Sequence, residues 1–389
     1  MALHLDSAKN IFISLSELQP EKFFVVIDER FNEKLINKLI FKYGSIPKAA
    51  LELQIPWASI YNWKKSNQYP LHYLTLILSS LNFDFKYLER NLVAIKSGFN
   101  WKSKGGGLSK PLYPKFPILI SKELIRIIAH LFGDGCISLN KKKQITAAYY
   151  NQEYLLRKQF KKDIRFVFGD IYLSEGINKT TPFVSIPAPI AFILLSKINS
   201  FGSDNFEIPL FIKNSDKALR KEFLKSLFDD ECHVEYNPPQ RRIEFALCNH
   251  KAVLDVKKLL EEFNINITPV YFRCDDEGYM KYYFYIRNYH NLYNFYKNIG
   301  LNHPNKLKNL ISIIKNPGRK SYARGETKLL ILALISKKDS TSTDLLIALN
   351  RKRVTINYWL SKLEVDGKIY RKEIRNLKKG IEIIWSLRK

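Results

Sequence analysis

Two stretches in the middle of the chain share one order of hydrophobic and polar positions. Each opens with apolar residues at helical spacing that end in an acid: SKELIRIIAHLFGDGCI at residues 121–137 and RKEFLKSLFDDECHV at residues 220–234. Such spacing predicts helices with a buried face. A short strand, a basic loop, a second strand and a long amphipathic helix follow in both stretches, and then two more strands and a helix. The pattern therefore predicts one structural unit that is used twice.

The two copies also carry an acid and an asparagine at matching distances. Asp134 precedes Asn151 by 17 positions, and Glu231 precedes Asn249 by 18. Each copy predicts the element order αββαββα, over about residues 121–215 and 216–315. We therefore expect residues 115–315 to form an α+β domain with pseudo-twofold symmetry.

Two polar stretches with glycine or proline separate this region from its flanks. Residues 101–114 and 316–326 are predicted to be linkers, which leaves flanking domains at residues 1–100 and 327–389. Both flanks are expected to be small helical domains.

The flanks differ in the order of their predicted elements. In the N-terminal flank, the order is that of a helix-turn-helix, with helices at residues 32–42, 46–53 and 57–66. In the C-terminal flank, the order is that of a winged helix, with helices at residues 327–336, 342–349 and 353–366 and a hairpin at 368–385. Both orders are typical of DNA-binding modules.

Composition and charge narrow the class of partner. The 389 residues include 63 Lys and Arg against 37 Asp and Glu, a formal charge of +26. That excess favours a polyanion, nucleic acid first and an acidic membrane surface second. No apolar run reaches the length of a membrane span, and the four cysteines form no CxxC pair. We therefore expect a cytoplasmic, nucleoid-associated protein without a membrane anchor, zinc ribbon or disulfide framework.

The acids that end the two repeated helices indicate a metal site. If the helices pack side by side, Asp134 and Glu231 approach one another, and two carboxylates ~4 Å apart repel by roughly 4 kcal/mol at an effective dielectric of about 20. A divalent cation removes that repulsion. Oxygen ligands with open water positions suit Mg²⁺, and such a site can hydrolyse phosphodiesters.

The two helices resemble the paired motifs of the LAGLIDADG (DOD-type) homing endonucleases in their two-motif, monomeric form. The segment IIAHLFGDG resembles one form of that motif, and LKSLFDDEC resembles the form that ends in Asp-Glu. The resemblance implies that Asp134 and Glu231 hold Mg²⁺ or Mn²⁺ and that the chain cleaves both strands of double-stranded DNA, as in intron homing. It also implies a monomer, and no organic cofactor is expected.

The family lays two four-stranded sheets into the major groove of DNA, which implies where the contacts fall. Basic and polar side chains of the repeat strands are the expected DNA contacts: Lys141, Lys142, Lys143, Gln144, Gln240, Arg241, Arg242, Arg273 and Arg287. In the flanking modules the expected contacts are Asn62, Lys64, Lys65, Arg351, Lys352, Arg353, Lys378 and Lys379.

The chain departs from the family pattern at two points. The family has glycine after each motif acid; Gly135 keeps it, whereas Cys232 replaces it, and cysteine does not adopt positive φ cheaply. The family also uses a basic residue near each acid. Lys281 is the candidate in the second copy; in the first copy the register points to Thr181, and Lys179 is the nearest lysine.

Two functions remain open. Retention of both acids favours a freestanding endonuclease; Cys232, the missing first-copy lysine and the two flanking modules favour a regulator that has lost cleavage, as in WhiA-like bacterial proteins. The ends of the chain, Met1 and SLRK without a His-Asn pair, disfavour a self-splicing intein.

Overall fold

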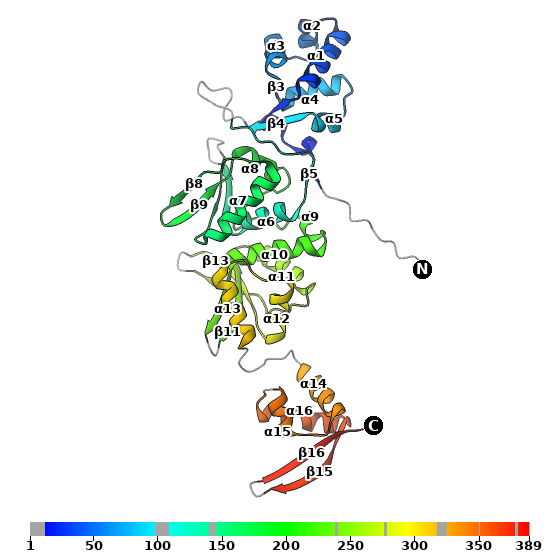
Figure 1. Ribbon diagram of the computed structural model, residues 1–389, viewed down its shortest axis with the longest axis vertical. Coiled ribbons are helices and arrows are strands. Elements are labelled where there is room, and N and C mark those ends of the chain that lie inside the picture. Colours follow the sequence, from blue (N-terminus) through cyan, green and yellow to red (C-terminus); the bar gives the residue numbers. More distant parts are fainter. Residues whose placement is uncertain are drawn as a thin grey trace, which may run out of the picture. The chain divides into compact units, whose positions relative to one another are not determined.

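The computed structural model shows an α+β protein, which confirms the predicted class (Figure 1). It describes residues 12–97, 109–139, 145–237, 240–275, 278–316, 325–349, 351–377 and 380–388. The chain forms two compact units: Met1–Glu231, Leu247–Leu259 and Phe272–Tyr282 make the first, and Cys232–Ala246, Leu260–Tyr271 and Tyr283–Lys389 make the second. Among the described helices, none has the length and apolar character needed to span a bilayer.

The two repeated stretches have the same order of elements. The first contains α6 (Lys122–Phe132), β6 (Gly135–Leu139), β7 (Ile145–Tyr150), α7 (Tyr154–Phe168), β8 (Glu175–Asn178), β9 (Thr181–Ser185) and α8 (Ala188–Leu195). The second contains α10 (Lys217–Glu231), β10 (Cys232–Asn237), β11 (Gln240–Leu247), α11 (His250–Glu261), β12 (Tyr271–Cys274), β13 (Met280–Ile286) and α12 (Tyr289–Asn298). The strand orders match as well, β6-β7-β9-β8 and β10-β11-β13-β12. Two further helices, α9 (Leu210–Lys213) and α13 (Pro304–Lys315), follow the first and second stretch.

Helix α6 forms because its sequence supplies both a cap and an apolar body. The Ser121 hydroxyl accepts a hydrogen bond from the Leu124 N–H, and most residues of the helix are buried. Helices α6 and α7 pack on the face of the first sheet from which Tyr149 projects. The Tyr149 ring lies 4.7 Å from Phe160 of α7 and 4.9 Å from His130 of α6.

A buried ion-pair network ties α6 to two other helices. The Arg126 guanidinium donates from Nη2 and Nε to the Asp163 carboxylate of α7, at 2.6 and 2.8 Å. Its Nη1 donates to Glu222 of α10 at 3.0 Å. The hydrogen bonds to Asp163 are the main cause of a raised Arg126 pKa. Bidentate geometry of this kind fixes the relative position of the three helices.

The prediction of a purely helical N-terminal domain was wrong. Helices α1 (Glu29–Tyr43), α2 (Ile46–Glu52) and α3 (Trp57–Ser66) lie within three residues of the predicted bounds. The region also contains a sheet of order β3-β2-β4 that the prediction missed. Its strands are β2 (Phe23–Ile27), β3 (Gln68–Pro70) and β4 (Leu92–Ser97), and the other elements are β1 (Phe12–Ile13), β5 (Ile118–Leu119), α4 (Leu71–Ser80), α5 (Phe85–Arg90) and two short 3₁₀ helices (Leu15–Glu17, Pro20–Lys22). The reason is that β2 pairs with strands far along the chain, which a local pattern does not reveal.

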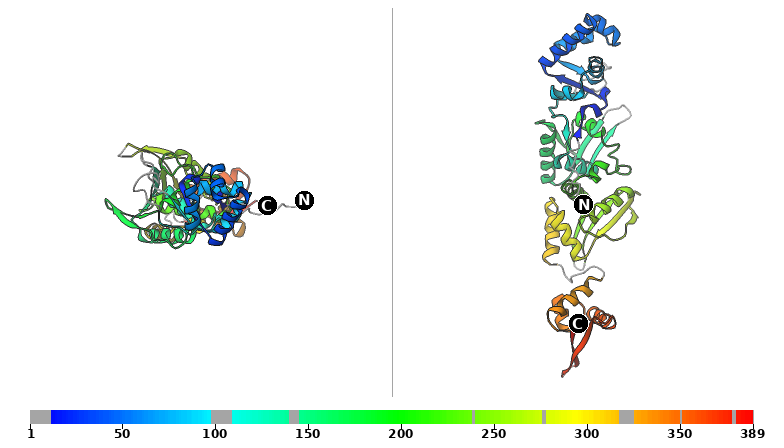
Figure 2. Two further views of the ribbon diagram at one scale, coloured as in Figure 1. Left: turned by 90° about the horizontal axis from the view of Figure 1, so that it is seen from above. Right: turned by 90° about the vertical axis from the view of Figure 1, so that its right-hand side faces the viewer.

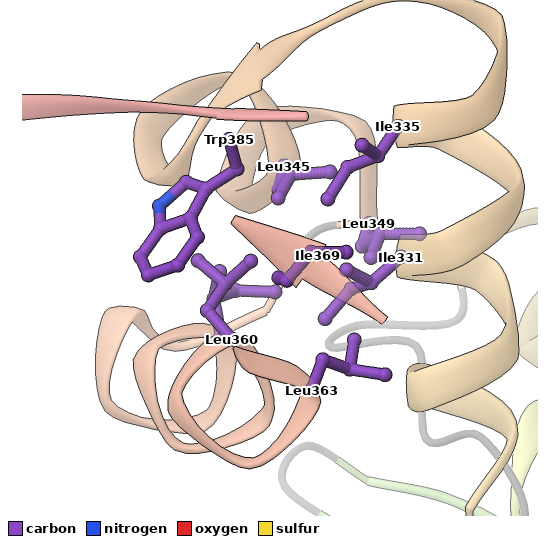
Figure 3. Packing of buried hydrophobic residues seen from close by; sticks show 9 residues of the cluster. Ile331, Ile335, Leu345, Leu349, Leu360, Leu363, Ile369 and Trp385 are labelled. Atoms are coloured by element: carbon purple, nitrogen blue, oxygen red, sulfur yellow. The ribbon is translucent and has the colours of Figure 1, made fainter. Parts of the chain in front are cut away.

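The C-terminal region packs three helices and a three-stranded sheet around one core. The elements are α14 (Glu326–Lys337), β14 (Ser340–Thr341), α15 (Ser342–Leu349), α16 (Arg353–Val365), β15 (Ile369–Leu377) and β16 (Gly380–Leu387), with strand order β14-β16-β15. Trp385 closes the core over Leu345 and Leu360 (Figure 3). The β15–β16 hairpin extends beyond the helices (Figures 1 and 2).

Candidate functional site

The two motif acids belong to one packed helix pair. Helix α10 ends at Glu231, whereas α6 ends at Phe132, so Asp134 lies in the turn before β6 rather than on the helix as expected. The two helices pack against each other within the first compact unit. Strand β7 fixes the Asp134 backbone, because the Tyr150 N–H donates to the Asp134 carbonyl oxygen at 3.0 Å.

The end of α6 approaches α10 closely at Gly133. A Cβ atom at this position would lie 2.7 Å from the Cβ atom of Asp230 and 2.8 Å from its Oδ2. Only glycine fits such a contact without a shift of one helix. Gly133 therefore lets α10 place Asp230 inside the first repeat.

Asp230 is enclosed by donors from the first repeat. Its Oδ2 lies 2.9 Å from His130 Nδ1, and its Oδ1 accepts the Tyr149 hydroxyl at 2.8 Å and the Asn151 amide at 3.2 Å. Burial lowers the pKa of His130, but Asp230, with Asp229 and Asp163, raises it by more, so the net shift is upward. The Asp230 side chain is fully buried. Of the three successive acids in the second motif, Asp229 and Asp230 have buried side chains and Asp230 has a structural role, which leaves Glu231 as the acid at the helix end.

Asp134 is held by the same asparagine. The Asn151 amide donates to Asp134 Oδ2 at 2.8 Å, and the Asp134 residue is exposed. Through Asn151, the acid of the first motif is therefore connected to the residue before Glu231.

Lys281 is the predicted basic residue of the second repeat. Its ammonium forms an ion pair with Asp275 at 3.2 Å. Burial raises the pKa of the Cys248 thiol; Lys281 opposes this shift, whereas Glu231 and Asp275 reinforce it. Lys179 lies in the exposed turn between β8 and β9, with a φ of 54°, and its role stays a prediction.

The concern about positive φ at Cys232 was wrong. Neither Cys232 nor Gly135 is among the described residues with positive φ. What Gly135 satisfies is a steric requirement, because a Cβ atom there would lie 2.5 Å from the Leu131 Cα atom. The second copy avoids that requirement because α10 runs straight into β10 at Cys232.

Several predicted DNA contacts on the second repeat are held by aromatic rings and acids. The Arg242 and Arg287 guanidinium groups lie 4.2 and 4.3 Å from the Tyr285 ring centre, and Arg242 Nε donates to Glu235 at 2.7 Å. Arg241 lies 5.9 Å from the Tyr236 ring. Gln240 and Arg273 are exposed. Lys141, Lys142, Lys143, Gln144, Lys378 and Lys379 lie outside the described residues.

The predicted contacts of the flanking regions are mostly exposed. Asn62, Lys64 and Lys65 are exposed on α3, and Lys352 and Arg353 are exposed at the start of α16. Arg351 is half-buried, and its Nη2 donates to the Thr327 hydroxyl at 3.1 Å. Arg351 thus helps to hold α14, and it is less accessible than its neighbours.

The donor set suits a hard cation bound by few protein ligands. Within the ranges that the structure describes, no group of three His, Cys, Asp or Glu side chains is arranged to hold a metal ion. A closed zinc site does not fit this set. Mg²⁺ is commonly bound by one or two carboxylates, with water and phosphate oxygens as the other ligands. Asp134 and Glu231 fit that second pattern.

Four residues of the site were not predicted in their observed roles. The sequence indicated Asn151 only as a repeated asparagine, and it did not reveal the roles of His130, Tyr149 and Asp230. The sequence signal that could have indicated Asn151 was the matching asparagine after each motif. Which acids of the second motif are buried depends on how the helices cross.

Comparisons with known proteins give partial matches. No family model matches the chain. The chain is 26% identical over 223 residues to DNA-directed RNA polymerase subunit Rpo1N of Methanocaldococcus jannaschii, which covers 48% of this chain and 16% of the relative. It is 26% identical over 354 residues to the probable translation initiation factor IF-2 of the same organism, which covers 87% of this chain and 26% of the relative. The chain thus spans about a quarter or less of these relatives.

Solved structures with a similar arrangement carry the LAGLIDADG name or that of a homing endonuclease. The homing endonuclease I-DmoI in complex with DNA and Mn is 13% identical, with a TM-score of 0.34 over 46% of this chain and 96% of that chain. Full-length DUF199/WhiA from Thermatoga maritima is 14% identical, with a TM-score of 0.35 over 63% of this chain and 91% of that chain. The N-terminal LAGLIDADG domain of DUF199/WhiA is 16% identical, with a TM-score of 0.32 over 48% and 87%. At such low TM-scores these likenesses carry no argument about function.

Gly133→Ala is expected to destabilise the first compact unit by about 1–3 kcal/mol. The added methyl group would overlap Asp230, whose Cβ atom lies only 2.7 Å from the new atom. Urea unfolding measures the loss. In an Asp230→Gly background the same substitution should cost little, because the overlapping side chain is gone; an equal cost in both backgrounds would contradict the contact.

Proposed function

We propose that the protein is a site-specific endonuclease for double-stranded DNA, of the LAGLIDADG homing endonuclease class, that hydrolyses phosphodiesters with a divalent metal. One observation carries the proposal: the acids that close two matched motifs belong to one packed helix pair. Glu231 ends α10, and Asp134 is bound by the same Asn151 amide that binds the neighbouring Asp230. Two acids at one helix junction are what a shared phosphodiester site requires.

Each residue has a defined part in this function. Asp134 and Glu231 would hold Mg²⁺ or Mn²⁺ through their carboxylates. Such an ion, when bound, stabilises charge on the phosphate and makes a bound water more acidic. Lys281, whose ammonium pairs with Asp275 at 3.2 Å, is the candidate basic residue of the second half. Lys179 is the weaker candidate in the first half, because it lies in an exposed turn.

Basic side chains on the second sheet would bind the DNA backbone. Arg242 and Arg287 flank Tyr285, so both guanidinium groups lose less conformational freedom when they bind phosphate or a base edge. The formal charge of +26 supports a polyanionic partner. The flanking α1–α3 and α14–β16 regions are proposed as the helix-turn-helix and winged-helix modules that extend the DNA contact.

A DNA-binding regulator without cleavage is the second candidate function. One observation favours it: in the first repeat the register places Thr181 where the second repeat has Lys281, and the nearest lysine, Lys179, lies in an exposed turn. A site with two carboxylates depends on water and phosphate for its other ligands. The same scaffold therefore serves DNA binding even where cleavage is lost.

Selection of bound DNA followed by a cleavage assay separates the two functions. Duplexes that the full chain retains from a random library are incubated with the protein and either Mg²⁺ or Mn²⁺, and the ends of the products are mapped. The endonuclease is expected to break both strands at one fixed position. Enrichment of a sequence without any metal-dependent break would favour the regulator.

The double variant Lys64→Ala/Lys65→Ala is expected to bind the selected duplex more weakly and with less salt dependence. Loss of two phosphate contacts lowers the slope of log K against log salt by about 2. The control is Lys158→Ala/Lys162→Ala on α7. Both lysines are exposed on a helix that covers the face of the first sheet opposite to the one proposed to bind DNA. Equal slopes for the two double variants would contradict a role of α3 in DNA binding.

A further inference from the structure

The orientation of the Asn151 side chain is fixed at both ends of its amide. Its Oδ1 accepts the Glu153 N–H at 2.8 Å, at the start of α7. Its Nδ2 donates to Asp134 at 2.8 Å and to Asp230 at 3.2 Å. A flipped amide would direct an oxygen at two carboxylates and an NH₂ group at a backbone N–H. Only the observed orientation satisfies all three partners.

The second of these partners is itself immobile. Asp230 accepts hydrogen bonds from His130 and Tyr149, at 2.9 and 2.8 Å, and its Cβ atom lies against Gly133. A buried carboxylate with three donors has little freedom to move. Asp230 comes from the second motif, whereas Asn151 and Asp134 come from the first. The second motif therefore anchors the amide that contacts Asp134.

The equivalent asparagine of the second repeat has other partners. The Asn249 amide donates to the Phe206 carbonyl oxygen at 2.6 Å, and its Oδ1 accepts the Ala252 N–H at 3.1 Å. Both asparagines therefore accept a backbone N–H at the start of a helix. The Asn151 amide also donates to a motif acid, Asp134. This contact is additional to the role at the helix start that Asn151 shares with Asn249.

We propose that Asn151 is a positioning residue for the Asp134 carboxylate, and that the second motif sets this position through Asp230. The inference rests on the proposed function, since it concerns the metal-binding acid of that site. A carboxylate held by a fixed donor keeps one oxygen occupied and directs the other. Loss of a partner that orients a metal ligand typically costs about 10–100-fold in metal affinity.

The test compares Asn151→Ser with its matched control Asn249→Ser. Serine keeps an oxygen that accepts the backbone N–H, but it is too short and has too few donors to bridge the two acids. The Mn²⁺ affinity of the full chain is measured by EPR in complex with the already cut duplex, so that no turnover occurs. DNA affinity, thermal unfolding and the Mn²⁺ concentration for half-maximal cleavage are measured in parallel.

Asn151→Ser is expected to weaken Mn²⁺ binding by about 10–100-fold and to raise the Mn²⁺ requirement of cleavage in step, with DNA affinity retained. Asn249→Ser should leave the Mn²⁺ affinity and the Mn²⁺ requirement of cleavage near those of the wild type, even if it lowers thermal stability as much as Asn151→Ser does. Equal Mn²⁺ affinity of the two variants and of an active wild type would overturn the inference and leave the proposed function intact. A wild type that neither binds Mn²⁺ nor cuts would end the proposed function, and the inference with it.

Discussion

Asp134→Asn and Glu231→Gln are each expected to reduce DNA cleavage by about 100- to 1,000-fold, with DNA binding retained. Each change removes the charge of one acid at the α6–α10 junction while it keeps the size of the side chain. Electrostatic stabilisation of the phosphate then fails, and loss of a single such interaction typically costs about 10²–10³ in rate. Single-turnover cleavage of the selected duplex measures the effect.

Binding should survive these substitutions for an electrostatic reason. Removal of a negative charge near the DNA backbone lowers repulsion, and the phosphate contacts come from other side chains. Asp230→Asn is the informative comparison, because the amide keeps the size of a side chain that has a structural role. This substitution should lower the stability of the protein, and any loss of cleavage should follow from that loss of stability. A Glu231→Gln protein that cuts at the wild-type rate would exclude Glu231 from the site.

Arg126→Ala is expected to destabilise the first compact unit by about 3–5 kcal/mol. The substitution leaves the Asp163 carboxylate, whose side chain is only 2% exposed, without its bidentate partner. It also removes the contact between α6 and Glu222 of α10. Because Glu231 ends α10 and Asp134 lies in the turn after α6, cleavage should fall together with stability. Urea unfolding and cleavage at a fixed temperature measure both.

Two variants sharpen that prediction. Lys251→Ala breaks an ion pair with Glu207 that is highly exposed on both sides, and it should change stability little because water screens such a pair. Asp163→Asn in the Arg126→Ala background should recover part of the loss, since it removes the buried unpaired charge. A loss for Arg126→Ala no larger than that for Lys251→Ala would contradict the importance of the network.

The repeated elements followed from the sequence because their signals are local. The motif helices have a clear apolar face, and each is followed by strands and an asparagine at similar spacing. The N-terminal sheet did not follow, since β2 pairs with β3 and β4 across intervening helices. Strand pairing at long range leaves no period in the sequence of a single strand.

The hydrogen bonds around the candidate acids could not be predicted from the sequence. Asp134 and Glu231 were chosen from motif position, which a linear pattern can give. The enclosure of Asp230 by His130, Tyr149 and Asn151 depends on the close approach of two helices at Gly133. Three consecutive acids point in different directions around a helix, so only the packing decides which of them are buried, here Asp229 and Asp230.

Anomalous diffraction from Mn²⁺ in crystals of the full chain with its selected duplex tests the central claim most directly. We expect manganese in contact with the carboxylates of Asp134 and Glu231, beside a phosphate of the DNA backbone. DNA bound in the crystal without manganese at these two acids, or with manganese held by other residues, would contradict the account.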